Sequence, residues 1–598
     1  MKKNLFKGVS LVLACSLVLA SCSNGTTTTD TSTEGDTATT DATDVQDREA
    51  TDVETVEANT EAPNPALSRE DVSNTFVTTT SAPPAGVFSP AYYTSAYDSN
   101  IVSLLFEGLI SMNREGEYVP NIAESYEISE DGFTYTFKMK QDVTFSDGTP
   151  LTAKDVEATY LILADPTYDG RYVSVVQDMV GFDTFSAEGN TDTTMEGIKV
   201  IDDYTISFTF KEALRTNLSN LSMQVMSRDY YGYEKGNLEQ VKSLQNQPLG
   251  SGRYKLDRFE VDQFVEMSLN ENYTLGEQPD FERVVIKAVA DALSAEELVA
   301  GNIDYVSGEI LPEKIETALS QEYIGAAKYP RSGYGYLAMN TRETSPTSDQ
   351  RVRQALQFGY DGQAFCDAHF QGLAVPQDIP FSQVSWAYTE TLQNDLIKYD
   401  YDFEKASALL DEAGWIMADD GFRYKDGQKL IVRMPAMPEH AVLDTLVPML
   451  IQEWGELGVE MDITYMEFNS LIEKVQNGDG TDWDIFFMAS SWTTPDPNTS
   501  RTTWHSDYIG KGMSNYIGYS NPELDALWDE GRTIFDIEEA IPVYEEVGRI
   551  INESAAYIVV YANLYHDLYN ARLSNVNPHA LWSWDSDMTT WEVNNAAQ

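Results

Sequence analysis

Stretches in which apolar and polar residues alternate recur along the first half of the chain, and a period of two predicts half-buried β-strands. These stretches cover residues 134–140, 203–210, 252–259, 263–270 and 282–289. Later apolar positions have the spacing of helices instead, within residues 348–361, 402–415, 443–458 and 521–535. Strands and helices mixed in this way predict an α/β fold.

A helix is expected directly after the turn SDGTP at residues 146–150. Thr152 takes the N-cap position, and Asp155 lies three residues further on as its partner in a capping box. The 598 residues are too many for one hydrophobic core, so two or three domains are expected. No repeat of fixed period is present in the sequence, which excludes solenoids and propellers.

The N-terminus has the pattern of an export signal over residues 1–21, because lysines precede an uncharged apolar run from Gly8 to Ala20. This run is too short to span a membrane stably. The residues Leu-Ala-Ser-Cys that end at Cys22 resemble the lipobox of bacterial lipoproteins, which implies a diacylated Cys22. We therefore expect a protein that is lipid-anchored on the extracytoplasmic face of the cell membrane.

Residues 22–74 are rich in Thr, Asp and Glu and contain no aromatic residue. Such a segment cannot bury enough apolar surface to order itself, so a disordered linker is expected. The formal net charge of −57 repels nucleic acid phosphates and anionic headgroups, which argues against binding to DNA, RNA or a membrane surface. Cys366 is the only cysteine after Cys22, so we expect no internal disulfide.

Catalytic motifs are missing from the sequence. The five histidines do not form an H-E-x-x-H motif, and neither a G-x-S-x-G elbow nor a P-loop is present. Cys366 and His369 would share a helix face, which is more typical of core packing than of a catalytic dyad. A faint calcium-loop pattern at residues 477–486 places Met488 where a glutamate is required. We therefore expect no enzyme, no cofactor and no metal site.

An ordered series of motifs resembles the extracellular solute-binding proteins of family 5, the receptors of peptide-type ABC importers. The series includes LLFEGL, YVPNIAESY, DGFTYTF, FSDGTPLTAKDV, PLGSGRYKLDRF, FEKASALLDEAGW, WDIFFMASSWTTPDPN and YSNPELDAL, and it extends from about residue 75 to 575. The resemblance implies a fold like that of type II periplasmic binding proteins, with two lobes, a hinge and an extra subdomain. The expected boundaries are 75–332 for lobe I with its subdomain at about 111–248, 333–563 for lobe II, and 564–598 for the return to lobe I.

The same resemblance implies ligand-binding residues between the lobes. In the segment at residues 490–506, Asp496 is expected to pair with the α-amino group of a peptide, and Trp492 to supply an apolar or cation–π wall. The alternative is that Asp496 and Pro497 only form a turn while Trp492 packs in the core. On the facing lobe, Pro90, Tyr92 and Tyr93 are candidates. Near the hinge, Arg331 could bind a ligand carboxylate and Tyr334 could form a wall.

The expected function is a receptor that captures extended oligopeptides and delivers them to the transmembrane permease subunits of an ABC importer. Its expected partners are the peptide, the permease and, through the lipid on Cys22, the membrane, and we expect a monomer. Nickel, haem, an opine or a sugar is an alternative ligand, although His505 alone gives a nickel site little support. A further alternative is an adhesive surface lipoprotein that has no transport ligand.

Overall fold

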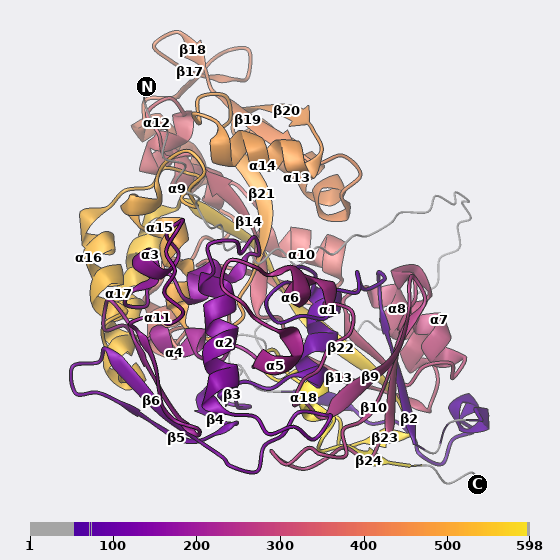
Figure 1. Ribbon diagram of the computed structural model, residues 1–598. Coiled ribbons are helices and arrows are strands. Elements are labelled where there is room, and N and C mark those ends of the chain that lie inside the picture. Colours follow the sequence, from indigo (N-terminus) through magenta and orange to yellow (C-terminus); the bar gives the residue numbers. More distant parts are fainter. Residues whose placement is uncertain (1–52, 71, 73, 595–598) are drawn as a thin grey trace.

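A computed structural model describes residues 53–594 except residues 71 and 73. The predicted signal peptide, Cys22 and the first part of the predicted linker lie outside the described residues. Figure 1 shows strands and helices mixed through the whole molecule, which confirms the α/β class. No helix in the part of the chain that the structure describes is long and apolar enough to cross a membrane.

An eleven-stranded sheet runs through the molecule in the order β1-β13-β22-β12-β2-β11-β10-β9. β14 and β15 also pair with β22, and β21 pairs with β14. The strands are β1 (Glu54–Val56), β2 (Thr75–Thr80), β9 (Tyr254–Glu260), β10 (Phe264–Leu269), β11 (Arg283–Ala288), β12 (Tyr305–Glu309), β13 (Ile324–Pro330), β14 (Gly333–Met339), β15 (Ala374–Gln377), β21 (Ile485–Ser491) and β22 (Tyr557–Asn570). The alternating pattern therefore located β9, β10 and β11 correctly.

Strand β22 changes its partners near its middle. From Leu564 to Asn570 it pairs with β13, whereas Tyr557 to Tyr561 pair with β14. The expected boundary between residues 563 and 564 stays a prediction. Of its fourteen residues only Tyr565 is not buried, so β22 is covered along nearly its whole length.

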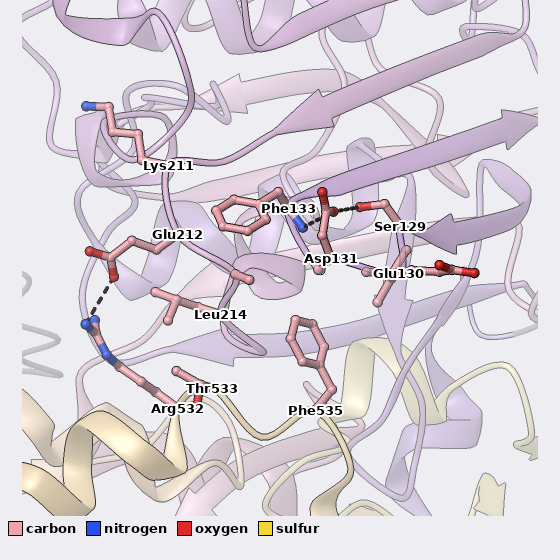
Figure 2. A pocket seen from close by; sticks show the side chains of 13 residues that line it. Ser129, Glu130, Asp131, Phe133, Lys211, Glu212, Leu214, Arg532, Thr533 and Phe535 are labelled. Carbon is pink, nitrogen blue, oxygen red and sulfur yellow. Dashed lines mark hydrogen bonds and ion pairs between the residues drawn. The ribbon is translucent and has the colours of Figure 1, made fainter.

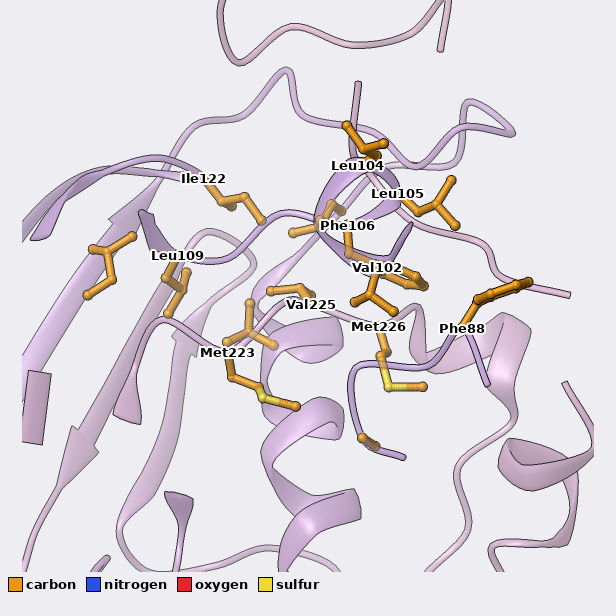
Figure 3. Packing of buried hydrophobic residues seen from close by; sticks show 14 of the residues in the cluster. Phe88, Val102, Leu104, Leu105, Phe106, Leu109, Ile122, Met223, Val225 and Met226 are labelled. Atoms are coloured by element: carbon orange, nitrogen blue, oxygen red, sulfur yellow. The ribbon is translucent and has the colours of Figure 1, made fainter. Parts of the chain in front are cut away.

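Buried apolar side chains form separate cores beside the two halves of β22. Two clusters take their residues from 62–326 and 568–591, and two others take theirs from 334–561. We call the first body lobe I and the second lobe II. Figure 3 shows part of the lobe I core, where Val102 of α1 (Ala96–Leu105) lies near Phe88 and Met226. Each lobe thus has its own hydrophobic core.

A smaller four-stranded sheet in lobe I has the order β5-β6-β8-β7. Its strands are β5 (Ala123–Ile128), β6 (Thr134–Met139), β7 (Ile198–Asp202) and β8 (Thr205–Thr209). The predicted helix is α2 (Ala153–Ala164), and the Asp155 carboxylate accepts the Thr152 backbone N–H at 2.8 Å, as a capping box requires. The later helical patterns are confirmed as α9 (Gln350–Phe358), α12 (Phe403–Glu412), α13 (Ala441–Glu456) and α16 (Pro522–Gly531).

The folded body begins earlier than the predicted end of the linker at residue 74. β1 pairs antiparallel with β13 at the edge of the large sheet. Ala66 is fully buried, and Arg69 donates to Asp304 at 2.7 Å. The sequence prediction missed this region because much of its order comes from backbone pairing with a free sheet edge and from a distant carboxylate, while its own apolar contribution is limited to small side chains such as Ala62 and Ala66.

Candidate functional site

The candidate site lies where the chain passes from lobe I to lobe II. Ser491, at the end of β21, is paired with Gly333 at the start of β14. The Trp492 backbone N–H donates to the Ser332 carbonyl at 2.8 Å, and the Ser332 hydroxyl donates to the Trp492 carbonyl, also at 2.8 Å. These bonds fix the start of the 490–506 segment beside the crossing.

Trp492 and Tyr334 lie together in the lobe II core. Trp492 is 5% exposed and Tyr334 is 4% exposed. The Trp492 ring is 5.8 Å from the Phe381 ring, measured between centroids. Burial raises the pKa of Tyr334, whose hydroxyl also interacts with the Trp492 side chain. Protein atoms therefore cover most of both side chains, and their role as ligand-binding walls stays a prediction.

Arg331 lies at the same crossing and joins three segments. Its Nη2 donates to the Ser491 hydroxyl at 2.7 Å and to the Ser490 carbonyl at 3.2 Å. Its Nη1 lies 3.5 Å from Oδ1 of Asn563 on β22. The buried Nε of Arg331 has no hydrogen-bond partner among the described residues. One donor of this guanidinium therefore remains for a further acceptor.

Asp496 begins the turn that the alternative interpretation predicted. Its Oδ1 accepts the Asn498 backbone N–H at 2.9 Å and so caps the short helix η6 (Pro497–Ser500). Pro497 suits the first position of this helix because that position needs no backbone N–H donor. The following helix α15 (Arg501–Trp504) carries Trp504, which is 1% exposed in the lobe II core.

The Asp496 carboxylate also pairs with Arg215 of lobe I. Nε of Arg215 lies 3.1 Å from Oδ2, and Nη2 lies 3.1 Å from Oδ1 and 3.0 Å from Oδ2. The Arg215 side chain is 11% exposed and that of Asp496 is 21% exposed. Two parallel bonds between planar groups form the strongest kind of arginine–carboxylate pair.

Lobe II surrounds the remainder of the Arg215 guanidinium. Nη1 donates to the Gly531 carbonyl at 3.1 Å and to the Ile534 carbonyl at 2.6 Å. The guanidinium carbon lies 5.0 Å from the Trp386 ring centroid and 5.6 Å from that of Tyr544. The sequence analysis did not identify Arg215, because a lone arginine after a strand belongs to no motif.

Tyr92 and Tyr93 form part of a different cluster, inside lobe I. The Tyr92 and Tyr93 rings lie 5.3 Å and 5.2 Å from those of Tyr168 and Tyr172. Tyr172 also donates from its hydroxyl to the Tyr93 carbonyl at 3.2 Å, and Pro90 is buried. The structure thus brings Arg331, Tyr334 and Trp492 together, while the contacts recorded for Tyr92 and Tyr93 are with lobe I. Their role as ligand-binding residues remains a prediction.

The acidic surroundings of His505 provide no metal centre. Its Nδ1 accepts the Asp507 backbone N–H at 3.1 Å, and its Nε2 lies 3.5 Å from Asp529. Within residues 53–594, apart from 71 and 73, no group of three or more His, Cys, Asp or Glu side chains has the arrangement of a metal site.

Comparison with known proteins decides the family. The family model described as "Bacterial extracellular solute-binding proteins, family 5 Middle" matches residues 117–511, well over half of the chain. The chain belongs to this family. Family 5 proteins bind solutes for ABC importers and are not enzymes. The two lobes and the crossing between them therefore belong to an extracellular solute-binding protein.

Individual family 5 relatives differ in the solute that their names state. The oligopeptide-binding protein AppA of Bacillus subtilis is 26% identical over 489 residues, which are 79% of this chain and 84% of that protein. Heme-binding protein A of Haemophilus influenzae is 27% identical over 506 residues, 82% and 88% of the two chains. The structure of B. subtilis AppA with a nonapeptide shares the fold, with a TM-score of 0.67 and 24% identity over 87% of this chain and 99% of that one.

Proposed function

We propose that this solute-binding protein captures extended oligopeptides between lobes I and II and delivers them to the permease of an ABC importer. The observation that carries the proposal is the similarity to the oligopeptide-binding AppA over 79% of this chain. A ligand that bridges two lobes stabilises the closed state, which a permease can distinguish from the open state.

The geometry at the crossing suits a peptide end group. The partly buried Arg331 guanidinium lies at this crossing, and a peptide carboxylate is a strong acceptor for a guanidinium. Trp492 and Tyr334 would border this end of the ligand, and Pro90, Tyr92 and Tyr93 would face it from lobe I. Asp496 was predicted from the family resemblance to pair with the peptide α-amino group, but Arg215 holds its carboxylate in this structure, so the proposed function does not depend on that role.

Native mass spectrometry tests the peptide proposal. The mature chain with Cys22→Ser, purified without denaturation, should carry a spread of peptides that can be released and sequenced. Arg331→Met should retain less peptide, and Arg351→Met is a matched control because Arg351 pairs with the neighbouring Asp349 at an exposed position. An empty protein whose thermal stability is unchanged by a peptide library would contradict the proposal.

Haem is the second candidate, because heme-binding protein A is about as similar to this chain as AppA is. The same purified sample separates the two ligands. A Soret absorption band in stoichiometric amount and no co-purified peptide would favour haem, whereas sequenced peptides without that band would favour the peptide proposal.

The lipid anchor is a separate part of the proposal. It is supported by the lipobox-like residues that end at Cys22. We expect the wild-type protein to sediment with membranes and the Cys22→Ser protein to be released, because a diacylated cysteine provides the acyl chains that hold it. Equal release of both proteins would contradict the anchor and leave the peptide proposal intact.

A further inference from the structure

Arg215 carries a charge from lobe I into lobe II. It follows β8 in the four-stranded sheet, whereas Asp496 is 281 residues away along the chain. The guanidinium contacts recorded among the described residues are all with lobe II, namely with Asp496, Gly531, Ile534, Trp386 and Tyr544. Lobe II therefore provides a complete site for this one side chain, with a carboxylate, two carbonyls and two aromatic walls.

A turn of lobe I also packs against the loop that presents Asp496. Gly116 has a φ of +82°, and a Cβ on it would lie 2.9 Å from Cγ of Pro495. Tyr118 lies on the strand that follows this turn, and burial together with the Asp496 charge raises the pKa of Tyr118 to about 12. Asp496 is thus approached from lobe I by both Tyr118 and Arg215.

The surrounding contact between the lobes combines polar pairs with an open cavity. The Arg215 backbone N–H donates to the Arg532 carbonyl at 3.0 Å, and the Arg532 side chain pairs with Glu212 at 3.1 Å. A cavity of about 780 Å³ lies beside them. Figure 2 shows Phe133 from lobe I and Phe535 from lobe II on its walls. Domain interfaces that are loosely filled separate more readily than a close-packed core.

We infer that Arg215 and Asp496 form a closure clamp, an ion pair that holds lobes I and II together and raises ligand affinity without touching the ligand. This inference rests on the proposed function, in which the lobes close around a solute. When the lobes part, both charges regain water, so the clamp biases closure without locking it.

The clamp and the predicted role of Asp496 as an ammonium partner make opposite predictions. In the clamp, Asp496 accepts three bonds from Arg215 and one from the Asn498 backbone, which uses its acceptor capacity. Removing Arg215 then weakens peptide retention. If Asp496 instead held the peptide ammonium, removing Arg215 would free the carboxylate and strengthen retention.

Hydrogen exchange of the peptide-free mature chain, again with Cys22→Ser, tests the clamp without any ligand. We expect Arg215→Met and Asp496→Asn each to speed amide exchange at residues 531–535 by about tenfold. The double variant should exchange no faster than the faster single variant, because both changes remove one interaction. Lys211→Met is the matched control, since Lys211 lies in the same segment but pairs at 2.8 Å with Asp183 of lobe I. It should leave exchange unchanged.

Arg215→Lys keeps the charge but loses the bidentate geometry, so we expect exchange between that of wild type and Arg215→Met. Circular dichroism identifies a variant that does not fold, and in that case Asp496→Asn alone decides the test. Wild-type exchange in folded Asp496→Asn, additive effects in the double variant, or stronger peptide retention by Arg215→Met would each overturn the clamp. A protein that never carries peptide would contradict the proposed function. The exchange experiment needs no ligand and would still test whether the Arg215–Asp496 pair holds the lobes together.

Discussion

For Asp496, the sequence predicted the local turn but not the residue that its carboxylate binds. The Asp-Pro pair correctly indicated a turn, and the family resemblance indicated a place near the crossing. Its partner could not be predicted, because Arg215 is 281 residues away and reaches it only through the way in which the lobes meet. Arg331, Tyr334 and Trp492 come together more predictably, since the pairing of β14 with β21 places their segments side by side.

The buried Asp304 carboxylate binds one arginine from the N-terminal part of lobe I and one from its C-terminal part. It is fully buried and lies 2.7 Å both from Nη1 of Arg572 and from Nη2 of Arg69. We expect Asp304→Asn to lower the free energy of unfolding by about 3 kcal/mol, because it removes the negative charge that compensates buried guanidinium groups. Urea denaturation measures this loss. Asp203→Asn removes an exposed pair with Lys154 and should change the free energy of unfolding little. Equal urea midpoints for Asp304→Asn and Asp203→Asn would contradict the stabilising role of Asp304.

His579 should make stability depend on pH. Burial, followed by the charge of Arg114, lowers its pKa to about 4, so the folded protein keeps the ring neutral down to that pH. The unfolded chain takes up the proton near pH 6.5, and stability is therefore lost as the pH falls from about 6.5 to about 4. We expect the stability advantage of wild type over His579→Gln to shrink by about 3 kcal/mol between pH 7.5 and pH 4. A constant difference in urea denaturation would contradict this.

At the scale of elements, the sequence predicted those strands and helices well whose own residues stabilise them. Alternation located β6 and β8 to β11, and the capping box located the start of α2. β22 was not predicted, because a strand buried along nearly its whole length has no alternation of apolar and polar residues. β1 was missed because its three residues are exposed and gain order only by pairing with β13.

The segment before β2 should contribute measurably to stability. A chain that begins at residue 75 loses β1, the buried Ala66 and the contact of Arg69 with Asp304. We expect it to unfold with a free energy at least about 2 kcal/mol lower than that of a chain beginning at residue 53. The mature chain from Cys22 is the control and should match the chain from residue 53. Equal stability of the chains from 53 and 75 would show that the segment is dispensable.

At the scale of the whole molecule, two separate cores share one continuous strand. Because β22 pairs with β13 over one half and with β14 over the other, a change in the angle between the lobes would bend β22 near its middle. The net charge of −57 also favours separation of the lobes through repulsion, which a bound ligand and the closure clamp would oppose. These features suit a protein that alternates between open and closed states.

Small-angle X-ray scattering tests most directly whether the lobes close around a peptide. The mature Cys22→Ser protein would be freed of ligand by partial unfolding and refolding, and then measured with and without the peptides released from it. A smaller radius of gyration with peptide, and a larger one for peptide-free Arg215→Met than for peptide-free wild type, are the predicted results. Binding of the peptides with an unchanged radius of gyration would contradict capture by lobe closure.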